Sequence, residues 1–168
     1  FFFAPSSAMI ILKFGGTSVG TPTSIKQVIT LIKRSDAAEM AKANGRHIAV
    51  VFSAFAGVTN QLLKLGQTAK DGGDWEQEFA ALTQRHLDAI KELVAAPQQP
   101  RVCAHVTDTL QELNKYLQGV SCLKELSSRT SALVVSFGER LSAYIISEAL
   151  KADIPDVEFL DARDVVVT

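Results

Sequence analysis

The sequence predicts an α/β fold, a three-layer α/β/α sandwich with a mainly parallel sheet. Two short apolar runs, each followed by small residues, are typical of buried strands. A segment with apolar residues at helical spacing follows each run. Because this alternation of strand and helix requires crossover connections, we expect the strands to be parallel and the helices to pack on the sheet.

The first predicted strand is MIILKF, residues 9–14, and two glycines end it. We expect a natural start at Met9, so residues 1–8 are interpreted as a leader or remnant outside a domain that spans residues 9–168. A helix over residues 23–34 is predicted because its apolar residues share one face, namely Ile25, Val28, Ile29 and Ile32.

The second strand is predicted over residues 47–55, HIAVVFSAF, which is rich in Val and Ile and follows an Asn-Gly-Arg turn at residues 44–46. The next helix begins at about Thr59. The sequence DGGD, residues 71–74, ends that helix.

An all-helical stretch between residues 75 and 119 interrupts the alternation. Pro97 and Pro100 end its first apolar stripe, and Gly119 is predicted to cap the second. After a third helix, VEFLD at residues 157–161 is predicted to return as a strand, and VVVT ends the chain. The three stripes are Phe79, Leu82, His86, Ile90 and Leu93; Val102, Val106, Leu110, Leu113 and Leu117; and Leu133, Phe137, Leu141, Tyr144, Ile145 and Glu148.

The composition is that of an ordinary globular protein, with 168 residues, 47% of them hydrophobic and 21% charged. A formal net charge of −1 argues against a nucleic-acid or membrane-surface binder, since both need a basic excess. No apolar run approaches the roughly 20 residues of a membrane span. Cys103 and Cys122 fit no metal-ligand spacing and are interpreted as reduced core thiols of a cytoplasmic protein.

The turn after the first strand has the residues of a phosphate site. Lys13 ends the strand, and Gly15, Gly16, Thr17 and Ser18 follow it. Glycines let backbone N–H groups approach an anion closely, and the lysine adds a mobile positive charge. The lysine precedes the glycines, which excludes a P-loop, and the spacing does not match the dinucleotide fingerprint. The alternative is an ordinary turn with a surface lysine.

Two later stretches contain groups suited to the same edge of the sheet. Ser53 and Thr59 follow the second strand, and their hydroxyls can bind a carboxylate or phosphate; alternatively, Thr59 or Asn60 caps the following helix. In SFGERLSA, Gly138 permits a close approach, and Glu139 beside it can receive an ammonium group or lie on a solvated helix face.

Together, KFGGTSV, SAFAGVTN and SFGERLSA resemble the three motifs of the aspartokinases, in the amino-acid kinase family, and they occur in the same order. The resemblance covers residues 9–168. It implies the amino-acid kinase fold and phosphorylation of the side-chain carboxylate of L-aspartate with ATP and Mg²⁺, the first step of lysine, threonine and methionine biosynthesis. By similarity, Lys13 holds the transferring phosphoryl group, and Gly15 and Gly16 line its path. Ser53 and Thr59 then contact aspartate, and Glu139 takes its α-ammonium group.

The resemblance implies only the substrate-side portion of such a kinase, since the family's nucleotide-binding and allosteric regulatory parts find no match here. We therefore expect this chain to be inactive by itself and its full-length parent to be a homo-oligomer. The segment LQGVSCLKELSSRT is more similar to bifunctional aspartokinase–homoserine dehydrogenases than to stand-alone enzymes. The alternatives are another amino-acid kinase, acting on glutamate or acetylglutamate, and a non-catalytic aspartate-binding fragment.

Overall fold

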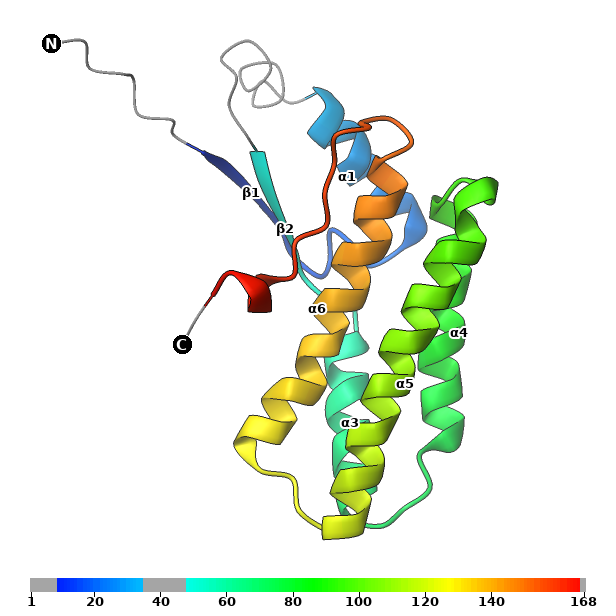
Figure 1. The fold of residues 1–168 in the computed structure, drawn as a ribbon, viewed down its shortest axis with the longest axis vertical. Coiled ribbons are helices and arrows are strands. Elements are labelled where there is room, and N and C mark those ends of the chain that lie inside the picture. Colours follow the sequence, from blue (N-terminus) through cyan, green and yellow to red (C-terminus); the bar gives the residue numbers. More distant parts are fainter. Residues whose placement is uncertain (1–8, 35–47, 167–168) are drawn as a thin grey trace, which may run out of the picture.

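A computed structural model describes residues 9–34 and 48–166 of the chain (Figure 1). The predicted leader, the Asn-Gly-Arg turn and the last two residues of VVVT lie outside the described residues. Within the described residues, no helix combines the length and apolarity that crossing a bilayer requires. The predicted α/β class with a parallel sheet is confirmed.

The described sheet consists of two parallel strands, β1 (Ile10–Phe14) and β2 (Ile48–Phe52). Phe14 pairs with Phe52, and their rings stack with centroids 5.8 Å apart on the face that packs against the hydrophobic core. Lys13 pairs with Val51 on the opposite face. That face is open in the described part of the chain, because Val51 is 49% exposed and Ile11 is 65% exposed.

Five α-helices accompany the sheet in the described residues: α1 (Pro22–Arg34), α3 (Val58–Lys70), α4 (Glu76–Leu93), α5 (Gln99–Leu123) and α6 (Ser128–Leu150). Two short 3₁₀ helices, η1 (Ala96–Gln98) and η2 (Ala162–Asp164), precede α5 and follow α6. Helix α1 starts where expected, because the side chains of Thr21 and Ser24 each accept a hydrogen bond from the other's backbone N–H.

Helices α3 to α6 pack side by side as a bundle, and the upper half of α6 passes beside β2 (Figure 1). The predicted apolar stripes form its core: Leu82 and Ile90 of α4, Leu113 of α5, and Phe137 and Ile145 of α6 are all fully buried. The helical stretch that interrupts the strand–helix alternation is thus half of this bundle.

The prediction that Gly119 caps a helix was wrong. Helix α5 continues to Leu123, and Lys124, with φ of 54°, takes the left-handed position that ends it. The helix continues because Val120 extends the buried stripe after Leu117, and burying this side chain outweighs the cost of about 1 kcal/mol for a glycine within a helix.

The predicted strand VEFLD is not a strand in the structure. Residues 157–161 keep the alternation of half-buried and exposed side chains, but no strand pairs with them in the described part of the chain. Val157 and Phe159 instead pack against the core, where the Phe159 ring meets Tyr144 edge-on at 5.4 Å. The segment descends along α6 (Figure 1) and ends in η2.

Both cysteines are free, but the prediction of core thiols holds only in part, because Cys103 packs against the core and Cys122 does not lie in it. Cys103 is half-buried, and Cys122 is exposed near the end of α5.

Candidate functional site

The three motif stretches meet at the peptide units of Ser53, directly after β2. The Ser53 N–H donates to the Phe14 carbonyl at 3.1 Å, which extends the β1–β2 ladder by one residue. The Ser53 carbonyl accepts a hydrogen bond from the Ser142 hydroxyl of α6 at 2.9 Å. One residue of the second stretch is therefore bonded to both the first and the third.

Glycines allow this convergence, as shown by where an added Cβ atom would lie. At Gly16 it would lie 3.4 Å from the Ala54 carbonyl oxygen, and at Gly20 it would lie 3.1 Å from the Ala56 Cβ. At Gly138 it would lie 2.9 Å from the Ala54 Cβ, closer than two carbon atoms normally approach. The β1–α1 turn and helix α6 thus both approach the loop after β2 closely, and their missing side chains make the room.

Lys13 lies at the carboxyl end of β1 with an exposed side chain. Its Nζ atom is 3.8 Å from the position of a Cβ on Gly15, so the ammonium group is beside the first glycine of the turn. The Gly15 carbonyl accepts hydrogen bonds from the N–H groups of Ser18 at 3.0 Å and Val19 at 3.3 Å. Thr17 is exposed and Ser18 is half-buried, with the Ser18 N–H already engaged within the turn.

Thr59 does not cap α3, and neither does Asn60. The helix begins at Val58, and Gly57, with φ of 81°, occupies the cap position without a side-chain hydrogen bond. Thr59 is half-buried in the first turn of α3, where N–H groups are free of intrahelical partners. Ser53 is also half-buried, and the side-chain period of two assigns it to the face of the sheet that carries Lys13.

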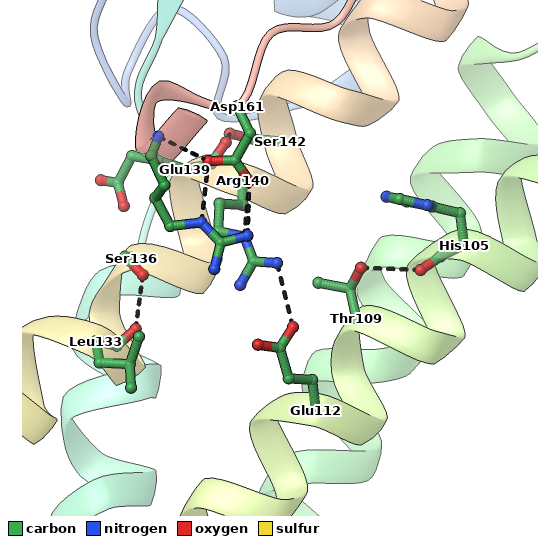
Figure 2. A network of polar contacts seen from close by, with 10 residues as sticks. His105, Thr109, Glu112, Leu133, Ser136, Glu139, Arg140, Ser142 and Asp161 are labelled. Carbon is green, nitrogen blue, oxygen red and sulfur yellow. Dashed lines mark hydrogen bonds and ion pairs between the residues drawn. The ribbon is translucent and has the colours of Figure 1, made fainter. Parts of the chain in front are cut away.

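Glu139 lies on α6 with an exposed side chain, next to a network of charged residues (Figure 2). The Arg140 guanidinium lies 4.6 Å from the centroid of the Phe137 ring. It contacts Glu112 of α5 at 3.2 Å and Asp161 at 3.4 Å. Through Asp161, the network fixes the segment after α6 beside the turn that carries Glu139.

Asp161 also caps η2 and binds the guanidinium of Arg163 at 2.8 Å. The hydrogen bonds from Arg163 hold the pKa of the Asp161 carboxyl below its usual range despite partial burial. Asp161 therefore remains a carboxylate between two guanidinium groups.

Neither histidine in the described residues is placed as a general base for this site. His86 is fully buried in α4, its Nδ1 lies 2.8 Å from the Leu82 carbonyl, and its Nε2 has no hydrogen-bond partner among residues 9–34 and 48–166. Burial lowers its pKa to about 4, so the ring is neutral at pH 7. His105 of α5 is in ring contact with Tyr144, with centroids 3.9 Å apart.

No cluster of three or more His, Cys, Asp or Glu side chains with metal-site geometry occurs among the described residues.

Two residues that join the stretches, Ser142 and Ala54, were not among the predicted site residues. A signal for Ser142 was present, because it lies one helical turn after Gly138 on the same face of α6 as buried Leu141 and Ile145. A hydroxyl on such a face needs a hydrogen-bond partner. Ala54 is one of the small residues that were expected to leave room after the second strand, but the folded structure is needed to show that two glycines approach this one.

Comparison with known proteins gives a consistent set of similarities. The model of the "Amino acid kinase family" matches residues 8–167. Aspartokinase 1 of Arabidopsis thaliana is 31% identical over 144 residues, which are 83% of this chain and 23% of that protein. The aspartokinase of Chlamydia muridarum is 30% identical over 166 residues, 99% of this chain and 33% of that protein.

A bifunctional aspartokinase/homoserine dehydrogenase of Zea mays is 27% identical over 156 residues, 92% of this chain and 16% of that protein. Among solved structures, Escherichia coli aspartokinase III in complex with aspartate and ADP superposes with a TM-score of 0.65 at 20% identity. It covers 86% of this chain and 29% of that protein. The chain thus spans a third or less of the length of these relatives.

Proposed function

Because the chain belongs to the amino acid kinase family, we propose that it is the substrate-side portion of an aspartate kinase. The reaction is transfer of the γ-phosphoryl group of ATP to the side-chain carboxylate of L-aspartate, giving 4-phospho-L-aspartate. Support comes from the similarity to aspartokinases along 83% to 99% of this chain and from the solved relative, whose complex contains aspartate and ADP.

The observation that carries the proposal is the meeting of the three stretches at Ser53. The hydrogen bonds of its N–H and carbonyl join the end of β1, where Lys13 lies, to the turn of α6 that carries Glu139. An anion-binding turn and an ammonium-binding carboxylate are the groups that orient an amino acid whose side chain must receive a phosphoryl group.

The chemistry needs charge neutralisation more than proton transfer. A free aspartate side chain has a pKa near 3.9 and is already a nucleophilic carboxylate at pH 7. No general base is then needed, in keeping with the neutral, buried ring of His86. Two unit negative charges 4 Å apart repel by about 4 kcal/mol at an effective dielectric constant of 20. In the proposed mechanism, the Lys13 ammonium and the N–H groups of Gly15 and Gly16 offset this repulsion at the phosphoryl group.

The remaining residues orient the substrate. Thr17 and Ser18 add hydroxyls beside the phosphate, Ser53 and Thr59 bind the aspartate, and Glu139 takes its α-ammonium group. Mg²⁺ in kinases is held largely by the ATP phosphates and water, and the described residues bring no carboxylate cluster to the site.

Activity assays on the full-length protein that contains this chain test the proposal. With ATP and Mg²⁺, we expect ADP release to depend on L-aspartate and not on L-glutamate or N-acetyl-L-glutamate. Turnover with either glutamate compound and none with aspartate favours the alternative kinases. The 168-residue chain by itself is expected to release no ADP, and aspartate-dependent turnover by it would contradict the assignment to a substrate-side portion.

Binding calorimetry on the 168-residue chain helps to distinguish the proposed kinase portion from a non-catalytic aspartate-binding fragment. Binding of L-aspartate without ATP fits the proposed portion, provided that the full-length protein is active. Aspartate binding by a full-length protein that never turns over ATP would instead favour an aspartate-binding role without catalysis.

A further inference from the structure

Ser142 of α6 has a fully buried hydroxyl with a long-range partner. Its Oγ donates to the Ser53 carbonyl at 2.9 Å across a separation of 89 residues, and it also lies 3.1 Å from the Glu139 carbonyl of its own helix. Two other serines of α6, Ser136 and Ser147, bond only to carbonyls of the preceding turn, at 2.7 Å each. Among these three serines, Ser142 thus joins α6 to the sheet edge.

The position of this hydroxyl is fixed by close packing one turn earlier. Gly138 and Ser142 are four residues apart and therefore lie on the same side of α6. Gly138 contacts Ala54, the residue after Ser53, so closely that an added methyl group would lie 2.9 Å from the Ala54 Cβ. Helix α6 is therefore seated against two successive residues of the loop after β2.

The hydrogen bond from Ser142 holds the second of the two backbone polar groups of Ser53. The Ser53 N–H is held by the Phe14 carbonyl of β1, and its carbonyl is held by Ser142. A buried carbonyl that loses its donor leaves an unsatisfied polar group and tends to rotate toward another partner. Rotation of this peptide unit changes the backbone angles of Ser53 and Ala54 and shifts the loop after β2 relative to the turn of α6 that carries Glu139.

We propose that Ser142 is a positioning residue that holds the Ser53 hydroxyl and the Glu139 carboxylate at the relative position needed to bind one amino-acid substrate. This inference rests on the proposed function, since it assigns the aspartate site to these two side chains. Ser142 itself does not touch the substrate. It acts by fixing the backbone of the residues that do.

The variant Ser142→Ala in the full-length protein tests the inference, with Ser147→Ala as the matched control. Ser147 is also buried in α6 and also bonds a carbonyl three residues earlier, but its hydroxyl makes no hydrogen bond to Ser53. We expect Ser142→Ala to raise KM for L-aspartate about tenfold, which corresponds to 1.4 kcal/mol. The KM for ATP and kcat should change less than about twofold, and Ser147→Ala should leave KM for L-aspartate unchanged.

A second measurement needs no substrate. In the 168-residue chain, the ¹³C chemical shift of the Ser53 carbonyl should change in Ser142→Ala and stay the same in Ser147→Ala. An unchanged shift means that the hydrogen bond is absent in solution and overturns the inference.

The outcomes separate the two proposals. A wild-type full-length protein without aspartate-dependent ADP release refutes the proposed function, and the inference with it. An active wild type in which Ser142→Ala has the same KM for L-aspartate as Ser147→Ala refutes the inference alone. If Ser142→Ala raises the KM values for L-aspartate and ATP equally and melts at a lower temperature than Ser147→Ala, Ser142 has a general structural role, and this result also refutes the inference.

Discussion

The variant Gly138→Ala tests the packing that brings α6 to the candidate site. An added Cβ would lie 2.9 Å from the Ala54 Cβ and 3.2 Å from methyl groups of both Val58 and Leu62. Favourable carbon–carbon contacts lie at about 3.5–4.0 Å. The helix or the loop must therefore move by several tenths of an ångström, and three neighbours on two elements resist that movement.

Two opposing effects determine how much Gly138→Ala changes the free energy of unfolding. Overpacking a close-packed core costs about 1–3 kcal/mol, whereas alanine is better than glycine within a helix by about 1 kcal/mol. Gly119→Ala isolates the second effect, because Gly119 is exposed in α5 and an added Cβ meets nothing within 4 Å. We expect Gly119→Ala to raise the free energy of unfolding by about 0.5–1 kcal/mol. The free energy for Gly138→Ala should lie about 1–3 kcal/mol below that of Gly119→Ala.

Urea unfolding of the 168-residue chain at pH 7, followed by circular dichroism, measures this difference. The slope with urea should be the same in both variants, so that the midpoints compare directly. If Gly138→Ala is as stable as Gly119→Ala, α6 is not seated on Ala54 as described, and the convergence of the three stretches lacks its packing basis.

Two further predictions concern pH. His86 has its pKa lowered by burial to about 4 from 6.5, so between these values the unfolded chain binds a proton that the folded chain does not. The free energy of unfolding should therefore fall on acidification by up to about 1.4 kcal/mol per pH unit. In His86→Phe, this contribution to the dependence of the free energy on pH should be absent when urea unfolding is measured at several values between pH 7 and pH 5. Burial of Glu148 opposes ionisation, but hydrogen bonds from Lys151 and Arg101 keep its pKa below the usual 4.5. Glu148→Gln should lower the free energy of unfolding by about 1–2 kcal/mol at pH 7, since both cations can return to water. This loss should shrink below pH 4, where the wild-type carboxylate becomes protonated. A loss that does not depend on pH would contradict this account.

The sequence predicted those elements whose side-chain pattern matched a local structure. The stripe of α1, from Ile25 to Ile32, is buried as its spacing indicated, and the apolar strand β1 ends at the residue before the glycines. In both cases the local pattern and the tertiary packing favour the same conformation.

The predictions failed where tertiary partners decide the outcome. Gly119 looks like a helix cap, but burial of Val120 extends α5 beyond it. Val157 and Phe159 alternate like strand residues, but pairing requires a neighbouring strand, and in the described part of the chain these side chains pack against the hydrophobic core instead. Sequence motifs predicted a candidate site at Lys13, Ser53 and Glu139, but only the folded structure shows that the Ser142 hydroxyl has the Ser53 carbonyl as its partner.

The kinetics of Lys13→Ala in the full-length protein test the central claim most directly. Lys26→Ala removes an exposed lysine of α1 and serves as the control. If the Lys13 ammonium neutralises the migrating phosphoryl group, it acts mostly in the transition state, and kcat should fall at least about 100-fold while Lys26→Ala stays close to wild type. An unchanged kcat for Lys13→Ala, with only a higher KM, would contradict the role assigned to this residue and to the glycine turn beside it.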